Sequence, residues 1–232
     1  MGEAKIKVIA CANQKGGVGK TTTATHLAIG LHRAGRQTRL LDLDPQQNAI
    51  LCLSQDLKEE PGTQEIAGWR KYGATEGLEI LKPMGIPTPS SLKLACSAGN
   101  QIEFVVIDCP PSLEQGTEQA LEVADLILIP LQCEFLAMQG LAQILARVQA
   151  LARNPRVRVL PVMLESEKRI HQEVLEELRS HLPGQVCETW IPRDPNLSEA
   201  SSFGVSLFTH GPRAVGAQAY AKLVREVSHG WT

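Results

Sequence analysis

Residues 15–22 read Lys15-Gly16-Gly17-Val18-Gly19-Lys20-Thr21-Thr22, after an apolar run at residues 6–12 and before apolar residues in helical spacing. A strand, a glycine-rich loop and a helix in this order are the context of a phosphate-binding loop. The glycines allow backbone N–H groups to surround an anion, and the start of the helix adds a favourable dipole. The sequence therefore predicts that this loop binds the phosphates of a nucleotide.

Two side chains at the end of the loop fit the same chemistry. Lys20 is expected to reach the β- and γ-phosphates, and the hydroxyl group of Thr21 is expected to bind Mg²⁺. ATP or ADP together with Mg²⁺ is therefore the expected set of ligands. A simple surface turn is the alternative, but the motif and both flanking elements favour nucleotide binding.

The composition is that of one globular domain. The chain has 232 residues, enough for a single domain over 1–232, and only 4% of them are aromatic, which predicts an aliphatic core. A net charge of −2 gives no general argument for nucleic-acid binding. No apolar stretch approaches the roughly 20 residues of a membrane span. The first residues also lack the pattern of a signal peptide, so we expect a cytoplasmic protein.

Strands and helices alternate along most of the chain. We expect strands at 6–12, 38–43, 78–81, 104–108, 126–131, 157–164 and 186–191, and helices at 20–34, 167–182 and 215–227, with a further helix after residue 135. This order predicts an α/β fold, namely a single-domain, doubly wound, mostly parallel sheet flanked by helices.

Residues 54–100 have the weakest pattern. We expect a surface turn at 58–62 and a short helix from Thr63 to Trp69. Regular structure is expected to be broken by three prolines, Pro83, Pro87 and Pro89. Three neighbouring side chains form either a half-buried cover, which the pattern favours, or a partner surface: Trp69, Arg70 and Tyr72.

Acidic residues end two of the expected strands. Asp42 and Asp44 follow one apolar run, and Asp108 ends another. The carboxyl ends of parallel strands share one edge of the sheet, where ligands of open α/β sheets bind. Asp108 is expected to hold Mg²⁺ through a water molecule, and Asp42 is a second candidate ligand. A carboxylate beside a γ-phosphate, such as that of Asp44, can hold and polarise a water for in-line attack, although a simple strand-end turn is the alternative.

These segments resemble the ParA/MinD family of deviant Walker A P-loop ATPases, and the ParA/Soj partition ATPases most of all. The resemblance runs from residue 6 to about residue 227, is thin at 54–100, and rests on KGGVGKTT at 15–22, DLDPQQN at 42–48, IDCPPS at 107–112, PLQCEFLAMQGL at 130–141 and IPRDPNLSEA at 191–200. One departure is Gln47, which stands where the family usually has glycine.

The resemblance implies a homodimer that forms on ATP binding and hydrolyses ATP to ADP and phosphate. Lys15 would cross to the nucleotide of the partner subunit and act with Lys20 and Asp44 in catalysis. Pro192 and Asp194 would join residues 15–22 in binding the nucleotide, with Pro192 against the adenine. The resemblance further implies slow hydrolysis that a ParB-like protein or another adaptor stimulates.

The resemblance also implies that the ATP-bound dimer binds DNA without sequence preference and associates with the nucleoid. The candidate contacts are Lys168, Arg169, Arg193, Arg213, Lys222 and Arg225. Three positions that are usually basic in the family are not basic here: Glu167, Asn196 and Val215. Because non-specific binding depends on phosphate neutralisation, we expect DNA binding that is weaker or relocated.

Three other functions stay open at this point. A MinD-like membrane switch for division-site selection requires an amphipathic C-terminal helix, whereas residues 222–232 are short and mixed in charge. An iron–sulfur carrier requires clustered cysteines, but those of this chain are scattered: Cys11, Cys52, Cys96, Cys109, Cys133 and Cys187. A non-hydrolysing binding module is disfavoured by the intact lysines and acids. We therefore expect an ATPase that partitions or positions a plasmid, a chromosome or another cargo.

Overall fold

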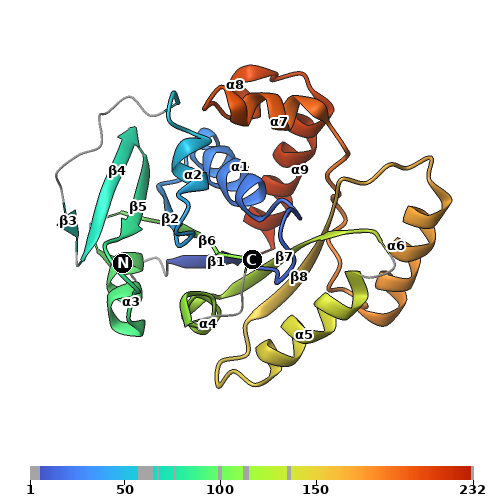
Figure 1. Cartoon of the computed structure of the whole chain (residues 1–232), viewed down its shortest axis with the longest axis horizontal. Coiled ribbons are helices and arrows are strands. Elements are labelled where there is room, and N and C mark those ends of the chain that lie inside the picture. Colours follow the sequence, from blue (N-terminus) through green and yellow to red (C-terminus); the bar gives the residue numbers. More distant parts are fainter. Residues whose placement is uncertain are drawn as a thin grey trace.

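The computed structural model describes residues 6–56, 65–66, 68–75, 77–98, 101–111, 115–134 and 137–230. Within them, eight strands form one sheet in the order β3-β4-β5-β2-β6-β1-β7-β8 (Figure 1). The parallel strands, in sheet order, are β5 (Leu78–Pro83), β2 (Thr38–Asp42), β6 (Phe104–Asp108), β1 (Lys7–Cys11), β7 (Leu126–Gln132) and β8 (Arg156–Val162). An antiparallel edge consists of β3 (Glu65–Ile66) and β4 (Trp69–Thr75).

Helices cover both faces of this sheet (Figure 1). One layer contains α1 (Lys20–Arg33), α2 (Asn48–Leu51), α7 (Pro195–Ser202), α8 (Leu207–His210) and α9 (Val215–His229). The other contains α3 (Pro89–Ser97), α4 (Gln115–Val123), α5 (Ala137–Gln149) and α6 (Arg169–His181). The expected doubly wound, mostly parallel fold is therefore confirmed.

Alternate residues of each central strand pack into two different cores. In β1, Val8 and Ala10 belong to the core beneath α3 to α6, whereas Ile9 and Cys11 belong to the core beneath α1 and α9. This follows from the two-residue period of a strand. Because both faces are covered, the central strands are apolar throughout, and the polar residues that matter for function lie at the strand ends.

The helix expected from Thr63 to Trp69 is wrong. Residues 65–66 form β3 and Trp69 begins β4, while residues 63, 64 and 67 and the turn expected at 58–62 lie outside the described residues. Trp69 has no exposed surface, and its indole N–H donates to the carbonyl oxygen of Ser91 at 3.2 Å. Burial of this ring against α3 favours the extended strand. Tyr72 is partly buried and Arg70 is exposed, so the region is a cover, as the pattern favours.

Proline does not exclude regular structure in this region. Pro83 ends β5, but Pro89 stands in the first turn of α3, where no backbone N–H is required. Thr88 and Ser91 close the start of this helix with reciprocal hydrogen bonds of 3.0 and 3.1 Å. The expectation of no regular element is therefore wrong for α3.

The strand expected at 186–191 is also wrong. The segment forms one isolated bridge to the edge strand β8, between Val159 and Val186. A second bridge joins Leu164 to Pro192, just after the segment. The carboxylate of Glu226 in α9 accepts the N–H groups of Glu188 and Thr189, both at 2.9 Å. Because a side chain takes up these N–H groups, they cannot extend the ladder of the sheet. Across the described residues, no helix is long and apolar enough to span a membrane.

Candidate nucleotide-binding site

The phosphate-binding loop joins β1 to α1 at the carboxyl edge of the sheet. Gly17 and Gly19 have left-handed φ angles of 74° and 76°, which residues with a Cβ atom rarely adopt. Gly19 is the N-cap residue of α1 and provides no side chain to cap it. The first N–H groups of α1 are therefore available to an anion, as the sequence predicts.

A cleft of about 1870 Å³ lies at this edge and brings most of the predicted nucleotide contacts together with the predicted catalytic residue Asp44. Those that line it are Gly16, Gly17, Gly19, Lys20, Thr21, Thr22, Asp44, Pro192 and Asp194. Two residues of the loop, Lys15 and Val18, line a separate cavity of about 300 Å³ beside α5. Val18 is buried, so its side chain packs rather than binds.

The register of the sheet brings the acidic residues together. β6 lies between β1 and β2, and Asp108 pairs with Cys11 on one side and with Asp42 on the other. Asp42 and Asp108 have no exposed surface, and Asp44, just beyond the end of β2, lines the cleft. The acidic edge predicted from the sequence is therefore present beside the phosphate-binding loop.

Asp108 has the properties of a metal ligand. Neither of its buried carboxylate oxygens accepts a hydrogen bond of normal geometry from the described residues, which is rare for a buried polar group. Burial and the charge of Asp42 raise the pKa of Asp108 well above its usual range, and the Thr21 hydroxyl and Lys20 oppose this shift. A cation bound by Asp108 and Thr21 would supply the missing partner. Both side chains offer the oxygen ligands that Mg²⁺ prefers, so the residues fit the predicted metal.

Asp42 is less suited to hold a metal than Asp108. Its two carboxylate oxygens already accept the N–H groups of Asp44 and Ile50, at 3.0 and 3.3 Å. Burial raises the pKa of Asp42 to about 6, although these hydrogen bonds and the charge of Lys82 oppose the shift. Asp42 therefore shapes the turn that carries Asp44, and a role as a direct ligand stays a prediction.

The carboxylate of Asp44 is held in one orientation. One oxygen accepts the N–H group of Gln46 at 2.9 Å, and the other accepts the side-chain amide of Asn48 at 3.0 Å. Asp44 is 8% exposed and borders the cleft, so a water in the cleft can reach it. This arrangement suits a group that orients a nucleophile.

Lys20 lies at the base of the same site. Its side chain is buried, and its ammonium group donates to the carbonyl oxygen of Lys15 at 3.0 Å. Burial lowers the pKa of Lys20, while the nearby charges of Asp108 and Asp44 oppose the shift. A phosphate in the loop would provide this buried cation with the anion that it otherwise lacks at hydrogen-bond distance among the described residues.

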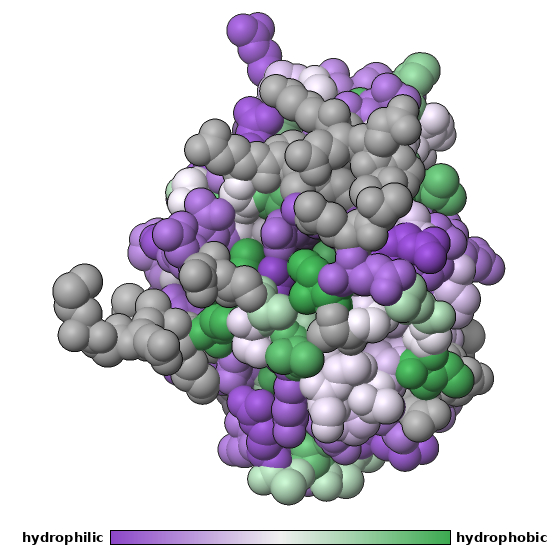
Figure 2. All heavy atoms as spheres, turned by 90° about the vertical axis from the view of Figure 1, so that its left-hand side faces the viewer, coloured by the Kyte–Doolittle hydropathy of each residue, from purple (hydrophilic) through white to green (hydrophobic). Residues whose placement is uncertain are grey.

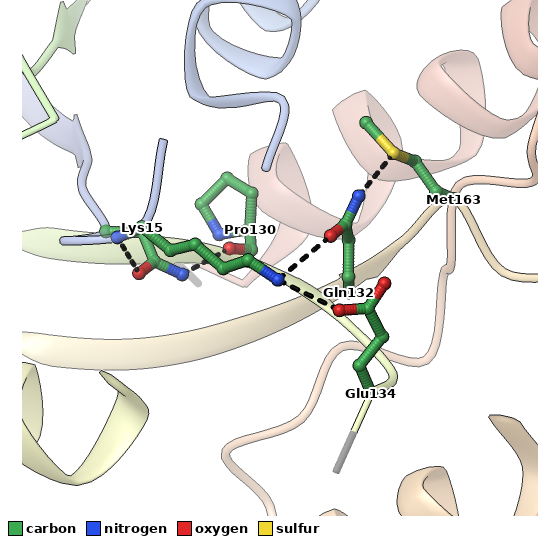
Figure 3. A network of polar contacts seen from close by, with 6 residues as sticks. Lys15, Pro130, Gln132, Glu134 and Met163 are labelled. Carbon is green, nitrogen blue, oxygen red and sulfur yellow. Dashed lines mark hydrogen bonds and ion pairs between the residues drawn. The ribbon is translucent and has the colours of Figure 1, made fainter. Parts of the chain in front are cut away.

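Lys15 points away from this site into a network with the end of β7 (Figure 3). Its ammonium group lies 2.9 Å from Glu134 Oε2 and 3.4 Å from Gln132 Oε1. The amide of Gln132 in turn contacts Met163 Sδ at 2.7 Å (Figure 3). Lys15 is therefore held within its own chain by Gln132 and Glu134, which the sequence motifs did not identify as site residues.

The predicted adenine contacts also border the cleft. Pro192 and Asp194 both line it, but the carboxylate of Asp194 is occupied. It accepts the backbone and side-chain N–H groups of Asn196 at 3.0 and 2.6 Å and the N–H of Gly216 at 2.9 Å. Burial alone would raise the pKa of Asp194, but these hydrogen bonds outweigh it and lower the pKa. Asp194 therefore caps α7, and adenine binding by Pro192 and Asp194 stays a prediction.

The candidate DNA contacts fall into two groups. Lys168 and Arg193 share Glu165, at 2.9 and 3.4 Å, and Arg169 pairs with Glu173 at 2.6 Å. Three further cations are exposed and form no ion pair with any described residue: Arg213, Lys222 and Arg225. The second group is therefore better able to neutralise phosphates.

Sequence reasoning missed part of the cleft wall. Lys82, at the end of β5, lines the cleft, and its ammonium group lies 3.3 Å from the carbonyl oxygen of Pro45. In the loop after β5, Met84 and Ile86 also line the cleft and are 50% and 75% exposed. The face that carries β3 to β5 shows apolar side chains grouped among polar ones (Figure 2). The sequence could have indicated these residues, because a strand was predicted at 78–81 and the carboxyl end of a parallel strand lies at the edge where ligands bind.

The fold and the site define a P-loop nucleotide-binding protein. The model of the CobQ/CobB/MinD/ParA nucleotide binding domain matches residues 9–207, so the chain belongs to this family.

Its relatives include partition proteins. The chromosome-partitioning ATPase Soj of Thermus thermophilus is 37% identical over 240 residues, covering 97% of this chain and 96% of the relative. The chromosome partitioning protein ParA of Caulobacter vibrioides is 34% identical, covering 96% and 94%. Among solved structures, cobyrinic acid a,c-diamide synthase of Mycobacterium smegmatis with bound ADP and magnesium is 26% identical with a TM-score of 0.76, covering 98% and 96%.

Proposed function

We propose that the protein is an ATPase that dimerises on Mg-ATP and partitions or positions DNA, such as a plasmid or a chromosome, or another intracellular cargo. The observation that carries this proposal is the position of Lys15. Its side chain lies outside its own nucleotide cleft and lines the cavity beside α5. A loop lysine directed away from its own site is placed to meet the nucleotide of a second copy. The partition functions of the Soj and ParA relatives support the same proposal.

Hydrolysis would use groups on both sides of the phosphate-binding loop. The N–H groups of residues 16–22 and the ammonium of Lys20 would hold the phosphates, and Thr21 and Asp108 would hold Mg²⁺. Bound Mg²⁺ supplies neutralising charge at the β- and γ-phosphate oxygens. Asp44, oriented by Gln46 and Asn48, would hold the water in line with the γ-phosphate. The products would be ADP and phosphate.

Dimerisation would complete the site. Lys15 of each subunit would contact the phosphates bound by the other and add charge as an arginine finger does. The ion pair that now holds Lys15 is 46% exposed on the lysine side and 53% exposed on the glutamate side. A pair of this exposure is weakly held, so phosphates of a second copy can compete for the lysine. We expect slow turnover by the protein alone and stimulation by a ParB-like protein or another adaptor.

The ATP-bound dimer would bind DNA without sequence preference and therefore associate with the nucleoid. Exposed, unpaired cations contribute most to such binding, because each one neutralises a phosphate. Among the described residues, Arg213, Lys222 and Arg225 meet this condition, whereas Lys168, Arg169 and Arg193 lie beside the carboxylates of Glu165 and Glu173. These exposed pairs are weak, but their carboxylates offset the local positive charge that attracts phosphates. We therefore place the DNA contact near α9 rather than at α6.

A MinD-like membrane function has less support. An amphipathic membrane anchor needs an apolar face that is free to enter the lipid. In α9 the apolar residues Tyr220, Leu223, Val224 and Val227 are buried within the protein. The last two residues, 231 and 232, lie outside the described residues.

Two substitutions test the proposal. Asp44→Ala should bind ATP, accumulate as a dimer and release phosphate at least 100-fold more slowly than the wild type, in line with loss of a general base. Lys15→Gln should bind nucleotide but fail to dimerise. Lys168→Gln is the matched control for dimerisation. Lys168 forms its own ion pair with Glu165, also at 2.9 Å, and its side chain is similarly exposed, at 51%. Phosphate release and light scattering after size-exclusion chromatography measure the two effects.

Wild-type turnover in Asp44→Ala would exclude the role of Asp44. Normal ATP-dependent dimerisation of Lys15→Gln would make Lys15 a bystander. The proposed DNA binding is tested separately, by whether the protein with ATP retards duplex DNA in a gel at several salt concentrations. No retardation even at low salt would exclude the nucleoid as the binding surface.

A further inference from the structure

His26 joins the phosphate-binding helix to the C-terminal helices. It lies in α1, one turn after the loop, and is 2% exposed. Its ring stacks on Tyr220 of α9, with ring centroids 4.8 Å apart and planes at 21°. A second ring, that of Phe208 in α8, lies 5.9 Å away in a tilted arrangement. His26, which lies in α1, therefore contacts both α8 and α9.

Both nitrogens of the imidazole are engaged. Nδ1 lies 2.7 Å from the carbonyl oxygen of Thr22, and the N–H group of Leu207 donates to Nε2 at 2.9 Å. A carbonyl oxygen can only accept and a backbone N–H can only donate, so Nδ1 carries the proton and Nε2 does not. The ring is therefore neutral, has one defined tautomer, and spans the distance between two backbones.

The two ends of this bridge have different surroundings. Thr22 closes the phosphate-binding loop and lines the nucleotide cleft. Leu207 begins α8, and the chain continues from there to Arg213 and α9. A rigid ring between two backbone groups transmits a displacement more directly than a flexible side chain, because it has no internal rotation between its two nitrogens.

We propose that His26 is a positioning residue that couples nucleotide binding at the start of α1 to the position of α8 and, through it, to the exposed cations near α9. The coupling of ATP to DNA rests on the function proposed above, whereas the coupling of nucleotide to α8 requires only that nucleotide binds. Phosphate bound to the first N–H groups of α1 fixes the carbonyl oxygen of Thr22, which fixes the imidazole and the N–H group of Leu207. Allosteric couplings of this kind change affinity by about 5- to 150-fold.

Two amide substitutions separate the halves of the bridge. Asn is short and places its amide N–H near the position of Nδ1, so His26→Asn keeps the bond to Thr22 and loses the bond to Leu207. Gln is longer and places its amide oxygen near Nε2, so His26→Gln keeps the bond to Leu207 and loses the bond to Thr22. Tyr220→Phe is the control, because it removes a different polar contact between α1 and α9, the 3.3 Å contact to Thr23, and keeps the ring.

The experiment is amide hydrogen exchange at Leu207, followed by NMR without nucleotide and with saturating Mg-ADP or a non-hydrolysable ATP analogue. In the wild type and Tyr220→Phe, nucleotide should slow this exchange by at least about fivefold, the lower end of the coupling range. In His26→Asn the amide should exchange rapidly in both states. In His26→Gln it should stay protected but no longer respond to nucleotide, which a purely structural role would not produce.

The outcomes separate this proposal from the proposed function. An unchanged exchange rate in wild-type protein saturated with nucleotide, or a full response in His26→Gln, would overturn the coupling and leave the ATPase proposal intact. A wild-type protein that binds no nucleotide would overturn both. The wild-type comparison needs no variant, so it decides the question even where a substitution prevents folding. In a retardation assay with ATP, the apparent affinity for duplex DNA should be at least about fivefold lower in His26→Gln than in Tyr220→Phe.

Discussion

The ammonium group of Lys15 lies 2.9 Å from a carboxylate oxygen of Glu134 in the same chain (Figure 3). The lysine that distinguishes this phosphate-binding loop is thus paired at the end of β7. Any contact of Lys15 with a second subunit must replace this pair. In the proposed dimer, Glu134 would therefore compete with the phosphates of the partner for the same cation.

Glu134→Gln should favour ATP-dependent dimerisation. An exposed ion pair contributes about 0 to 1 kcal/mol, so its loss should lower the ATP concentration for half-maximal dimerisation by up to about fivefold. Glu118→Gln is the matched control, because Glu118 forms a 2.9 Å surface pair with Arg147 and is similarly exposed. Light scattering across an ATP titration measures both. Equal curves for Glu134→Gln and the wild type would show that the pair does not restrain Lys15.

Asn48→Ala should slow hydrolysis more than it weakens binding. The side-chain amide of Asn48 holds one oxygen of Asp44 at 3.0 Å, and without it the carboxylate can rotate. We expect kcat to fall about tenfold, which corresponds to roughly 1.4 kcal/mol of transition-state stabilisation, with nucleotide affinity within about twofold. Gln46→Ala is the control, because alanine keeps the backbone N–H that Gln46 donates to Asp44 and removes only the longer, 3.4 Å contact between the Gln46 side chain and the amide of Asn48. Equal loss in both variants would contradict an orienting role of Asn48.

The acidic edge could be predicted from the sequence because local pattern and sheet geometry agree there. A parallel strand that ends in aspartate places its carboxylate at the ligand edge regardless of its neighbours, and Asp42 and Asp108 are indeed adjacent in the register. The contacts of Lys15 and His26 could not be predicted in this way. Each depends on residues more than a hundred positions away, Glu134 and Leu207, whose approach is decided by packing.

The errors in secondary structure have the same origin. Residues 186–191 are apolar enough for a strand, but Glu226 on a distant helix takes up two of their N–H groups. Trp69 was expected in a helix, but it is buried against α3 and begins a strand. In both cases a tertiary contact overrides local preference, as is common for short segments.

Removal of cations near α9 should weaken DNA binding more than removal of a paired cation at α6. Each phosphate neutralised by the protein adds about 0.9 to the slope of log K against log salt, so Lys222→Ala with Arg225→Ala should reduce the slope by up to about two. Arg169→Ala should change it less, because Arg169 is paired with Glu173 at 2.6 Å. Retardation of non-specific duplex DNA with ATP between low and moderate salt measures the slopes. A larger effect of Arg169→Ala would move the DNA contact to α6.

Mild acid should destabilise the protein through His26. Burial lowers the pKa of His26 from 6.5 to about 4, and the Thr22 carbonyl and the charge of Asp56 oppose the shift. Between these values the unfolded chain binds a proton that the folded protein excludes. The stability contributed by the neutral ring is therefore complete above pH 6.5 and is lost as the pH falls towards 4.

Urea denaturation at pH 7 and pH 5 measures this contribution. On going from pH 7 to pH 5, the free energy of unfolding of the wild type should fall by about 2 kcal/mol more than that of His26→Gln. The aspartate and glutamate residues titrate in both proteins, so their contribution cancels in the comparison. The same loss in both proteins would show that His26 takes up its proton in the folded state as easily as in the unfolded chain.

Two glycine-to-alanine substitutions in helices should have opposite effects on stability. A Cβ atom on Gly30 of α1 would lie 2.4 Å from Val224 Cγ2 of α9, so α1 and α9 must separate or Val224 must repack. We expect Gly30→Ala to lower the free energy of unfolding by about 1 to 3 kcal/mol, as overpacked cores do. Gly140 of α5 has nothing within 4 Å of the added Cβ atom. Gly140→Ala should therefore raise stability by roughly 0.5 to 1 kcal/mol, because alanine loses less backbone entropy on folding. Thermal or urea unfolding measures the change in the free energy of unfolding for both variants. If both variants were destabilised equally, the close approach of α1 and α9 would not be the reason for glycine at position 30.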